Sequence, residues 1–173
     1  IVVKPARGGS ALGIKLAHEP SEIPAALVAA LAYDKRLLLE RYIAGRELSV
    51  SIVGSERPMA LPIVEAIPLG REFYDFESRY TPGATDLRAP AELHPEVAEA
   101  VTQVALETYS VLDCHGFGRV DIMLDADDEP WVLELNTIPG LTDTSNFPKA
   151  AAAAGMTFDD LIARVLELAD LDS

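Results

Sequence analysis

Two polar side chains interrupt an apolar strand in the segment VLELNTIPGLTDTS at residues 132–145. Glu134 and Asn136 are two residues apart, so both side chains point to the same face of a β-strand. A loop with a proline, a glycine and several hydroxyl groups follows at once. A carboxylate and an amide on one face are oxygen donors, and their use depends on what lies on the neighbouring strand.

The segment GRVDIML at residues 118–124 is the expected partner strand. If the chain turns at Asp127 and Asp128, residues of the two strands pair at six positions. Two of these cross-strand pairs are polar, and the other four are apolar. The polar pairs are Arg119 with Asn136 and Asp121 with Glu134. The other pairs are Val120 with Leu135, Ile122 with Leu133, Leu124 with Trp131 and, beside the polar pairs, Met123 with Val132.

This register brings like charges together and so predicts a cation. Asp121 and Glu134 would have Cβ atoms about 4.5–5.5 Å apart, which is unfavourable unless they share a proton or a divalent cation. With Asn136 they form three hard oxygen donors, the set that Mg²⁺ uses alongside water and substrate phosphates. Zinc is disfavoured, because no histidine or cysteine falls in the pattern. The alternative is a solvated polar face on which Arg119 neutralises the acids.

The composition restricts the class of protein. The chain has 173 residues, 49% of them apolar, enough for one domain or two small ones with a hydrophobic core. Lys and Arg number 14 against 28 Asp and Glu, so the net charge of −14 disfavours nucleic acid and anionic membranes as partners. Cys114 has no cysteine to pair with, which suits a reducing, cytoplasmic location. The opening IVVKP reads as a strand already under way, so we expect the chain to be the C-terminal part of a longer protein.

Periodicity and turn residues predict the remaining elements. The expected strands are residues 1–4, 36–43, 46–54 and 59–67, and the expected helices are residues 22–34, 96–113, 148–155 and 158–170. Ser21 should cap the first helix, and Thr157 with Asp160 should form a capping box on the last. The strand at 36–43 should be buried, and Pro62 suggests that the strand at 59–67 lies at an edge.

The sequence also predicts the burial of one strand and the position of one long loop. The strand at 46–54 alternates between Leu48, Val50 and Ile52 on one face and Glu47, Ser49 and Ser51 on the other, which is typical of a half-buried antiparallel strand. Residues 70–95 show little periodicity and contain three prolines, which favours a lid, a binding loop or a disordered segment.

Five motifs in a fixed order resemble one protein family. They are KPARGGSALG at 4–13, LLERYIAGREL at 38–48, FYDFESRY at 73–80, GFGRVDIML at 116–124 and LELNTIPGLTDTSNFP at 133–148. Together they resemble the D-alanine–D-alanine ligases of the ATP-grasp superfamily, over nearly the whole chain. The last motif is the most specific, because other ATP-grasp enzymes share the acidic hairpin but not the loop behind it.

The resemblance implies an α+β ATP-grasp fold, a mainly antiparallel sheet with flanking helices and a nucleotide held between two subdomains. Residues 1–40 would be the end of the central subdomain and residues 41–173 the C-terminal catalytic subdomain, with the N-terminal domain not included. The implied activity is ATP-dependent joining of two D-alanines through an acylphosphate, for peptidoglycan synthesis. The full-length protein would be a cytoplasmic homodimer.

The resemblance also implies roles for individual residues. Asp121, Glu134 and Asn136 would hold two Mg²⁺ ions, with Mn²⁺ as an alternative, against the ATP phosphates. The residues around ATP would be Lys4 and Arg79 at the phosphates, Glu40, Arg41 and Ile43 at the edge of the adenine, Glu47 at the ribose, and Phe73 and Met123 flanking the base. Arg79 stands where the family commonly has a lysine, and the two donors are not equivalent.

The implied catalytic groups surround the two amino acids. Arg119 and the Gly140 amide would stabilise the tetrahedral oxyanion, and Ser145 with the Asn146 amide would hold the carboxylate of the second D-alanine. Ser10 and Tyr80 would belong to a hydrogen-bond set that closes the lid over the first substrate. Taken singly, each residue also has a structural explanation; Ser145, for example, could cap the helix that follows it.

Three other functions remain open at this point. The acceptor could be D-lactate or D-serine, although Tyr80 fits the dipeptide-forming ligases better. The chain could be a nucleotide-binding fragment that is inactive alone, since the family's first-substrate ammonium site lies in a region not included here. It could also be a structural domain with an acidic hairpin.

Overall fold

The computed structural model describes residues 1–69, 81, 83–142 and 145–169, and it divides into two compact units. The first unit contains Ile1–Ala44 and Pro68–Asp86, and the second contains Gly45–Ile67 and Leu87–Ser173. The second unit thus starts at Gly45, whereas the expected boundary followed residue 40, and Pro68–Asp86 joins the first unit. The predicted α+β class is confirmed, because helices pack on sheets whose described pairings are all antiparallel.

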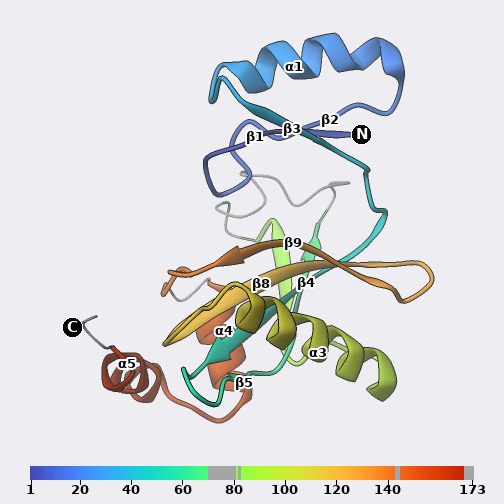
Figure 1. Cartoon of the computed structure of the whole chain (residues 1–173). Coiled ribbons are helices and arrows are strands. Elements are labelled where there is room, and N and C mark those ends of the chain that lie inside the picture. Colours follow the sequence, from blue (N-terminus) through green and yellow to red (C-terminus); the bar gives the residue numbers. More distant parts are fainter. Residues whose placement is uncertain (70–80, 82, 143–144, 170–173) are drawn as a thin grey trace. The chain divides into compact units, whose positions relative to one another are not determined.

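The first unit is a small sheet with a helix on one face. Its strands, in the order β2-β1-β3, are β1 (Val2–Pro5), β2 (Lys15–Leu16) and β3 (Leu37–Glu40). Helix α1 (Ile23–Leu31) follows the short 3₁₀ helix η1 (Pro20–Glu22) and runs along this sheet (Figure 1). The buried residues between them are Val3, Ala17, Ala26 and Ala30.

Two predictions for the first unit are wrong. Ser21 does not cap α1; the Glu22 carboxylate accepts hydrogen bonds from the backbone N–H groups of His18 and Glu19 instead. Strand β3 is not buried, since Leu38 and Leu39 are 44% and 54% exposed. The physical reason is its place at the edge of a three-stranded sheet, where a fully apolar sequence does not guarantee a covering layer.

The larger sheet has six strands and belongs mainly to the second unit, although the last residue of β6 and the first two residues of β7 fall within the range Pro68–Asp86. Five of them follow the order β7-β6-β4-β8-β9. Strand β5 pairs with the last two residues of β4, past the part of β4 that pairs with β6. The strands are β4 (Gly45–Val53), β5 (Met59–Ala60), β6 (Val64–Pro68), β7 (Thr85–Arg88), β8 (Phe117–Asp125) and β9 (Pro130–Asn136). The edge position suggested by Pro62 is wrong for β6, which lies between β7 and β4; Pro62 itself falls between β5 and β6.

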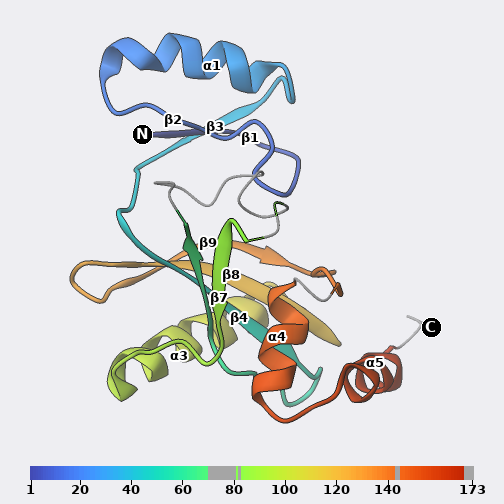
Figure 2. The same cartoon turned by 180° about the vertical axis from the view of Figure 1, so that it is seen from behind.

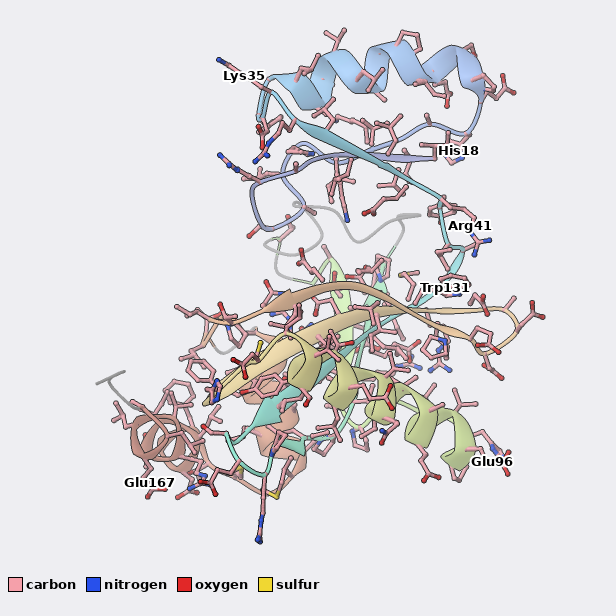
Figure 3. All side chains as sticks on the ribbon, viewed as in Figure 1. His18, Lys35, Arg41, Glu96, Trp131 and Glu167 are labelled. Carbon is pink, nitrogen blue, oxygen red and sulfur yellow. The ribbon has the colours of Figure 1, made fainter. Side chains whose placement is uncertain are left out.

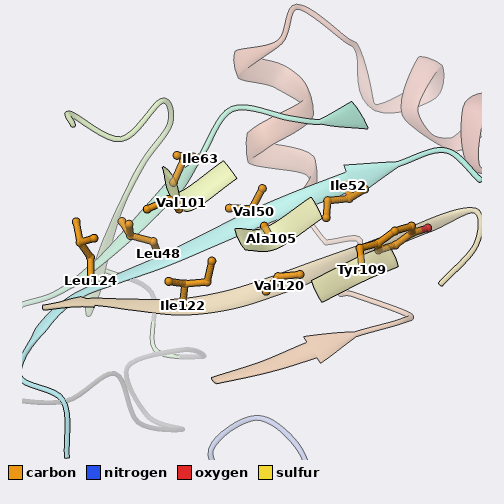
Figure 4. Packing of buried hydrophobic residues seen from close by; sticks show 10 residues of the cluster. All are labelled: Leu48, Val50, Ile52, Ile63, Val101, Ala105, Tyr109, Val120, Ile122 and Leu124. Atoms are coloured by element: carbon orange, nitrogen blue, oxygen red, sulfur yellow. The ribbon is translucent and has the colours of Figure 1, made fainter. Parts of the chain in front are cut away.

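Helix α3 (Pro95–Val111) covers one face of this sheet (Figure 4), and its bounds lie close to the predicted helix at residues 96–113. Its buried stripe is Val101, Ala105 and Tyr109. The stripe packs on the inward face of β4 and β8, which consists of Leu48, Val50, Ile52, Val120, Ile122 and Leu124. The Tyr109 hydroxyl donates to the Gly54 carbonyl at 3.2 Å, and burial raises the pKa of Tyr109 to about 12.

Helices α4 (Asn146–Ala153) and α5 (Phe158–Glu167) pack together, and α4 covers the opposite face (Figure 2). Their core joins sheet and helix residues: Val53, Leu61, Val64, Phe147, Ala150, Ala151 and Leu161. Strand β4 is therefore buried on both faces from Leu48 onward, and the prediction of a half-buried strand is wrong. None of the helices in the described ranges is long and apolar enough to cross a bilayer.

Figure 3 labels three side chains of the second unit. Glu96 lies in the first turn of α3, Glu167 at the end of α5 and Trp131 on the hairpin of β8 and β9 (Figure 3). The Trp131 indole N–H donates to the Asp125 carboxylate at 2.8 Å, which ties β9 to the end of β8.

The capping box of α5 predicts a dependence of stability on pH. The Thr157 hydroxyl and N–H donate to the Asp160 carboxylate at 2.6 and 3.0 Å, and these bonds lower the pKa of Asp160. A lowered pKa stabilises the fold above the ordinary carboxyl pKa, and this contribution is lost as the pH falls through the folded value. The Tm advantage of the native protein over Asp160→Asn should therefore shrink between about pH 6 and about pH 3. An advantage that is constant across this range would contradict the assignment, and Asp159→Asn is the control.

Candidate functional site

Side chains from β4, β8 and β9 form a polar face on the α4 side of the sheet. One row across the strands holds Ser51, Arg119 and Asn136, and the next holds Ser49, Asp121 and Glu134. These six residues are called the polar face below. In the following row Glu47 pairs with Met123, so the two residues that the resemblance assigned to the ribose and the base are neighbours.

The predicted hairpin register is right at the polar face and wrong toward the turn. The pairs Arg119–Asn136, Val120–Leu135 and Asp121–Glu134 are confirmed. Beyond them the register shifts, so the predicted pairs of Ile122 with Leu133, Met123 with Val132 and Leu124 with Trp131 are wrong. The observed pairs are Ile122 with Val132, Met123 with Trp131 and Leu124 with Pro130.

A β-bulge after Asp121 accounts for the shift. Leu133 is the extra residue of β9, because Glu134 pairs with Asp121 and Val132 pairs with Ile122. At the turn, Asp125 N–H donates to the Glu129 carbonyl, and Asp128 adopts a φ of 61°. The pairing of Asp125 with Glu129 leaves three residues in the turn, one more than expected. The extra turn residue shifts the strand register by one position. The bulge restores the offset before the polar face begins.

The buried carboxylate of Asp121 is held by a two-pronged ion pair. Arg119 Nε donates to Asp121 Oδ1 at 2.6 Å, and Arg119 Nη2 donates to Asp121 Oδ2 at 2.7 Å. Asp121 is 3% exposed and Arg119 is 9% exposed. Such charge-assisted, bidentate bonds are strong, and a buried charge requires them. The repulsion expected between Asp121 and Glu134 is thus offset by the guanidinium on the same strand.

Asn136 connects the two carboxylates. Its Nδ2 donates to Asp121 Oδ2 at 3.1 Å and lies 3.3 Å from Glu134 Oε1. Among the described residues, no three His, Cys, Asp or Glu side chains come together as a metal group. The carboxylate and amide groups of this face are those of Asp121, Glu134 and Asn136. That set suits a hard cation that completes its coordination with water or phosphate oxygens.

The loop behind β9 positions Ser145 beside Gly140. Ser145 is the N-cap residue of α4, but its hydroxyl makes no capping bond. It accepts from the Thr142 N–H at 3.2 Å and lies 2.8 Å from the Thr142 hydroxyl. A Cβ atom at Gly140 would lie 2.8 Å from Ser145 Oγ, so a side chain there would require the Ser145 hydroxyl to move. The two residues assigned to the oxyanion and to a carboxylate are therefore adjacent in space.

Asn146 begins helix α4, and its side chain contacts strand β4. It is the first residue of α4, where backbone N–H groups have no partner within the helix. Its side chain is buried, and Nδ2 donates to Ser49 Oγ at 3.0 Å. Sequence reasoning placed Ser49 on a polar strand face but did not find this contact, because it joins residues 97 apart.

The first unit contains its own group of predicted site residues. Lys4 on β1 and Glu40 on β3 form an ion pair with Nζ and Oε2 2.7 Å apart. Arg41 and Ile43 lie in the segment after β3, and Ser10 lies in the loop after β1 with a φ of 55°. Phe73, Arg79 and Tyr80 lie outside the described residues.

Sequence reasoning also missed an ion pair that fastens β4 to β6. Arg46 Nε and Nη2 donate to the two oxygens of Glu65 at 2.7 Å each, and Nη2 also donates to the Glu92 carbonyl at 3.0 Å. Hydrogen bonding to Glu65 raises the pKa of Arg46. The only sequence signal was a glutamate within the apolar run around β6, and this glutamate is buried. The pair holds the end of β4 from which Glu47 projects.

Comparison with protein families gives a match over almost the whole chain. The family model described as "D-ala D-ala ligase C-terminus" matches residues 1–167. The D-alanine–D-alanine ligase of Carboxydothermus hydrogenoformans is 43% identical over 169 residues, which are 97% of this chain and 54% of that protein. The ligase of Synechococcus sp. (strain JA-3-3Ab) is 42% identical over 96% of this chain and 51% of that protein.

Two solved ligase structures have the same fold as this chain. The D-alanine–D-alanine ligase of Bacillus anthracis, in complex with ATP, is 32% identical with a TM-score of 0.80 over 96% of this chain and 51% of that one. The VanG D-Ala:D-Ser ligase of Enterococcus faecalis is 29% identical with a TM-score of 0.85 over 96% of this chain and 48% of that one. The chain spans about half the length of the curated relatives it matches.

The buried ion pair predicts an asymmetric mutational effect. Arg119→Met leaves Asp121 buried without its partner, so the free energy of unfolding should fall by about 3–5 kcal/mol. Replacing both residues, in Arg119→Met/Asp121→Asn, should recover most of this loss because no charge is then left unpaired. The control Arg164→Met breaks the exposed pair with Glu167 and should cost about 1 kcal/mol or less. Urea unfolding measures all three, and equal losses for Arg119→Met and Arg164→Met would contradict the assignment.

Proposed function

Because this chain belongs to the family of D-alanine–D-alanine ligase C-terminal regions and has their ATP-grasp fold, we propose that the protein containing it joins two D-alanines at the expense of ATP. The observation that carries this proposal is the polar face, where Arg119 pairs with Asp121 beside Glu134 and Asn136. D-Alanyl-D-alanine made in this way would enter peptidoglycan synthesis. We infer a cytoplasmic homodimer for the full-length protein.

Asp121, Glu134 and Asn136 would be the ligands of Mg²⁺. An ionised carboxylate has about four lone-pair sites, and the bonds from Arg119 and Asn136 occupy three of those on Asp121. If the Asn136 amide turns over, its oxygen replaces its nitrogen at this point, and a second site on Asp121 becomes available. Mg²⁺, when bound, would supply positive charge to the phosphate oxygens of ATP.

Arg119 and the loop at Gly140 would act on the transferring groups. A carboxylate oxygen of the first D-alanine attacks the γ-phosphorus, the bond to the bridging oxygen breaks, and ADP leaves. The neutral amine of the second D-alanine attacks the acyl carbon and loses a proton; the carbon–oxygen bond to phosphate then breaks. Arg119 and the Gly140 N–H would stabilise the oxyanion that forms in between, where charge develops.

Ser145 and the Asn146 N–H would hold the carboxylate of the second D-alanine. Their position supports this role, since an anion is favoured at the N-terminus of a helix and the Ser145 hydroxyl does not cap α4. In the bound state the Ser145 hydroxyl would donate to that carboxylate and still accept from the Thr142 N–H.

Residues from several separate segments of the sequence would bind the nucleotide. In the second unit, Glu47 would accept from the ribose hydroxyls and Met123 would contact the base. In the first unit, Lys4 would turn from Glu40 to the phosphates, and Glu40 with the backbone of Arg41 and Ile43 would bind the adenine. Ser10, Phe73, Arg79 and Tyr80 keep the roles that the resemblance assigned to them.

Glu134→Gln separates a metal ligand from a structural residue. Glu134 is exposed and makes one weak contact with Asn136, so the free energy of unfolding should change by about 0.5 kcal/mol or less. Loss of a metal-binding carboxylate should instead reduce D-alanine-dependent ADP release by the full-length protein by about 100-fold or more. Glu129→Gln, which changes an exposed acid in the turn of the same hairpin, should leave the rate unchanged. A Glu134→Gln variant with the native rate would remove the metal role.

The identity of the acceptor is tested by competition. The D-serine-using VanG ligase has the higher TM-score of the two structures described, although the curated relatives near 43% identity are named for D-alanine. The full-length protein should form D-alanyl-D-alanine as its main product from an equimolar mixture of D-alanine, D-serine and D-lactate at neutral pH. Mass spectrometry of the products measures this. A preference for D-serine or D-lactate would replace D-alanine as the second substrate but keep the ligase chemistry.

A further inference from the structure

We propose that Ser49 is a positioning residue for the second amino acid: it holds the Asn146 side chain and thereby fixes the first turn of α4. This inference rests on the proposed function, in which the Asn146 N–H and the Ser145 hydroxyl bind the carboxylate of the acceptor. Ser49 would act through Asn146 and would not itself touch substrate.

The contact between Ser49 and Asn146 is buried and joins two parts of the site. Asn146 Nδ2 donates to Ser49 Oγ at 3.0 Å, and the two residues are 9% and 2% exposed. Ser49 lies on β4 directly opposite Asp121 on β8. One hydroxyl group therefore connects the strand next to the metal-binding acid with the helix whose N-terminus would bind the acceptor.

The rest of α4 is held by apolar packing. Phe147, Ala150 and Ala151 are buried in one cluster with Val53, Val64 and Leu161, and Val64 pairs with Ser49 on β4. Apolar contacts have no strict direction, whereas a hydrogen bond sets both distance and angle. The bond to Ser49 therefore determines how the first N–H groups of α4 point. Without it, a buried amide would lack its acceptor and the first turn would shift to reach another.

Ser51 provides a matched control on the same strand face. It is fully buried, and its Oγ has no hydrogen-bond partner within the described part of the chain. It lies two residues after Ser49 and faces Arg119 on β8. Ser51→Ala thus removes the same hydroxyl from the same strand without breaking a bond, and it should be neutral or slightly stabilising.

The experiment compares steady-state kinetics of full-length variants. In Ser49→Ala, the KM for the second D-alanine should rise roughly five- to ten-fold, the equivalent of one hydrogen bond, while the KM for ATP stays within about two-fold. The acylphosphate forms before the acceptor reacts, so its trapping by hydroxylamine as D-alanine hydroxamate should proceed at the native rate. Ser49→Thr keeps the hydroxyl and should restore the native KM.

Asn146→Ala and the double variant test the same bond from its other end. If Ser49 acts through Asn146, Ser49→Ala/Asn146→Ala should raise the KM for the second D-alanine no more than the worse single variant does. Native acceptor KM in Ser49→Ala, or an equal rise in Ser51→Ala, would overturn the inference. Equal rises in the KM for ATP and for the acceptor would also overturn it, because they would indicate general loss of structure. Absence of D-alanyl-D-alanine from the native protein would instead refute the proposed function.

Discussion

The bidentate pair between Arg119 and Asp121 is the interaction on which the polar face depends. Asp121 is buried on an inner strand of the sheet, and a buried carboxylate is strongly unfavourable unless an opposite charge and hydrogen bonds match it. Arg119 supplies the charge from the same strand face, so that a second carboxylate, Glu134, can stand opposite Asp121 without destabilising the sheet. The concentration of oxygen donors proposed as a metal site therefore exists because the guanidinium is beside it. The same guanidinium is the group proposed to stabilise the oxyanion.

The two helical layers explain where polar residues can be placed on this sheet. Helix α3 covers one face with an apolar layer, whereas α4 covers the other face with apolar residues and with the side chain of Asn146. The polar residues of that second face are held by specific bonds, those of Arg119 to Asp121 and of Asn146 to Ser49. Directional bonds act there beside apolar packing, and the residues that make them are then fixed in orientation as well as in place. This is the condition that a site needs if its donors are to be pre-organised for charge development.

Sequence reasoning found the residues that share a strand face and missed those that meet through the tertiary fold. Period-two alternation identified Arg119, Asp121, Glu134 and Asn136 as one face, and the structure pairs them as predicted. The same arithmetic failed from Ile122 onward, because a left-handed Asp128 and a bulge at Leu133 are set by local backbone geometry that alternation does not encode. The burial of β4 on both faces and the Ser49–Asn146 bond depend on where α4 packs, and no local pattern contains that information. Roles for Gly140 and Ser145 came from the family resemblance and remain proposals.

Asp121 and Glu134 are proposed to bind a divalent cation together with the ATP phosphates. The most direct measurement is a crystal structure of the full-length protein with Mg²⁺, D-alanine and a non-hydrolysable ATP analogue. Mg²⁺ density should lie about 2.0–2.1 Å from oxygens of both carboxylates, with the Asn136 amide oxygen turned toward the metal. Mg²⁺ bound to the phosphates without Asp121 and Glu134, and with Asn136 Nδ2 still on Asp121, would contradict this proposal.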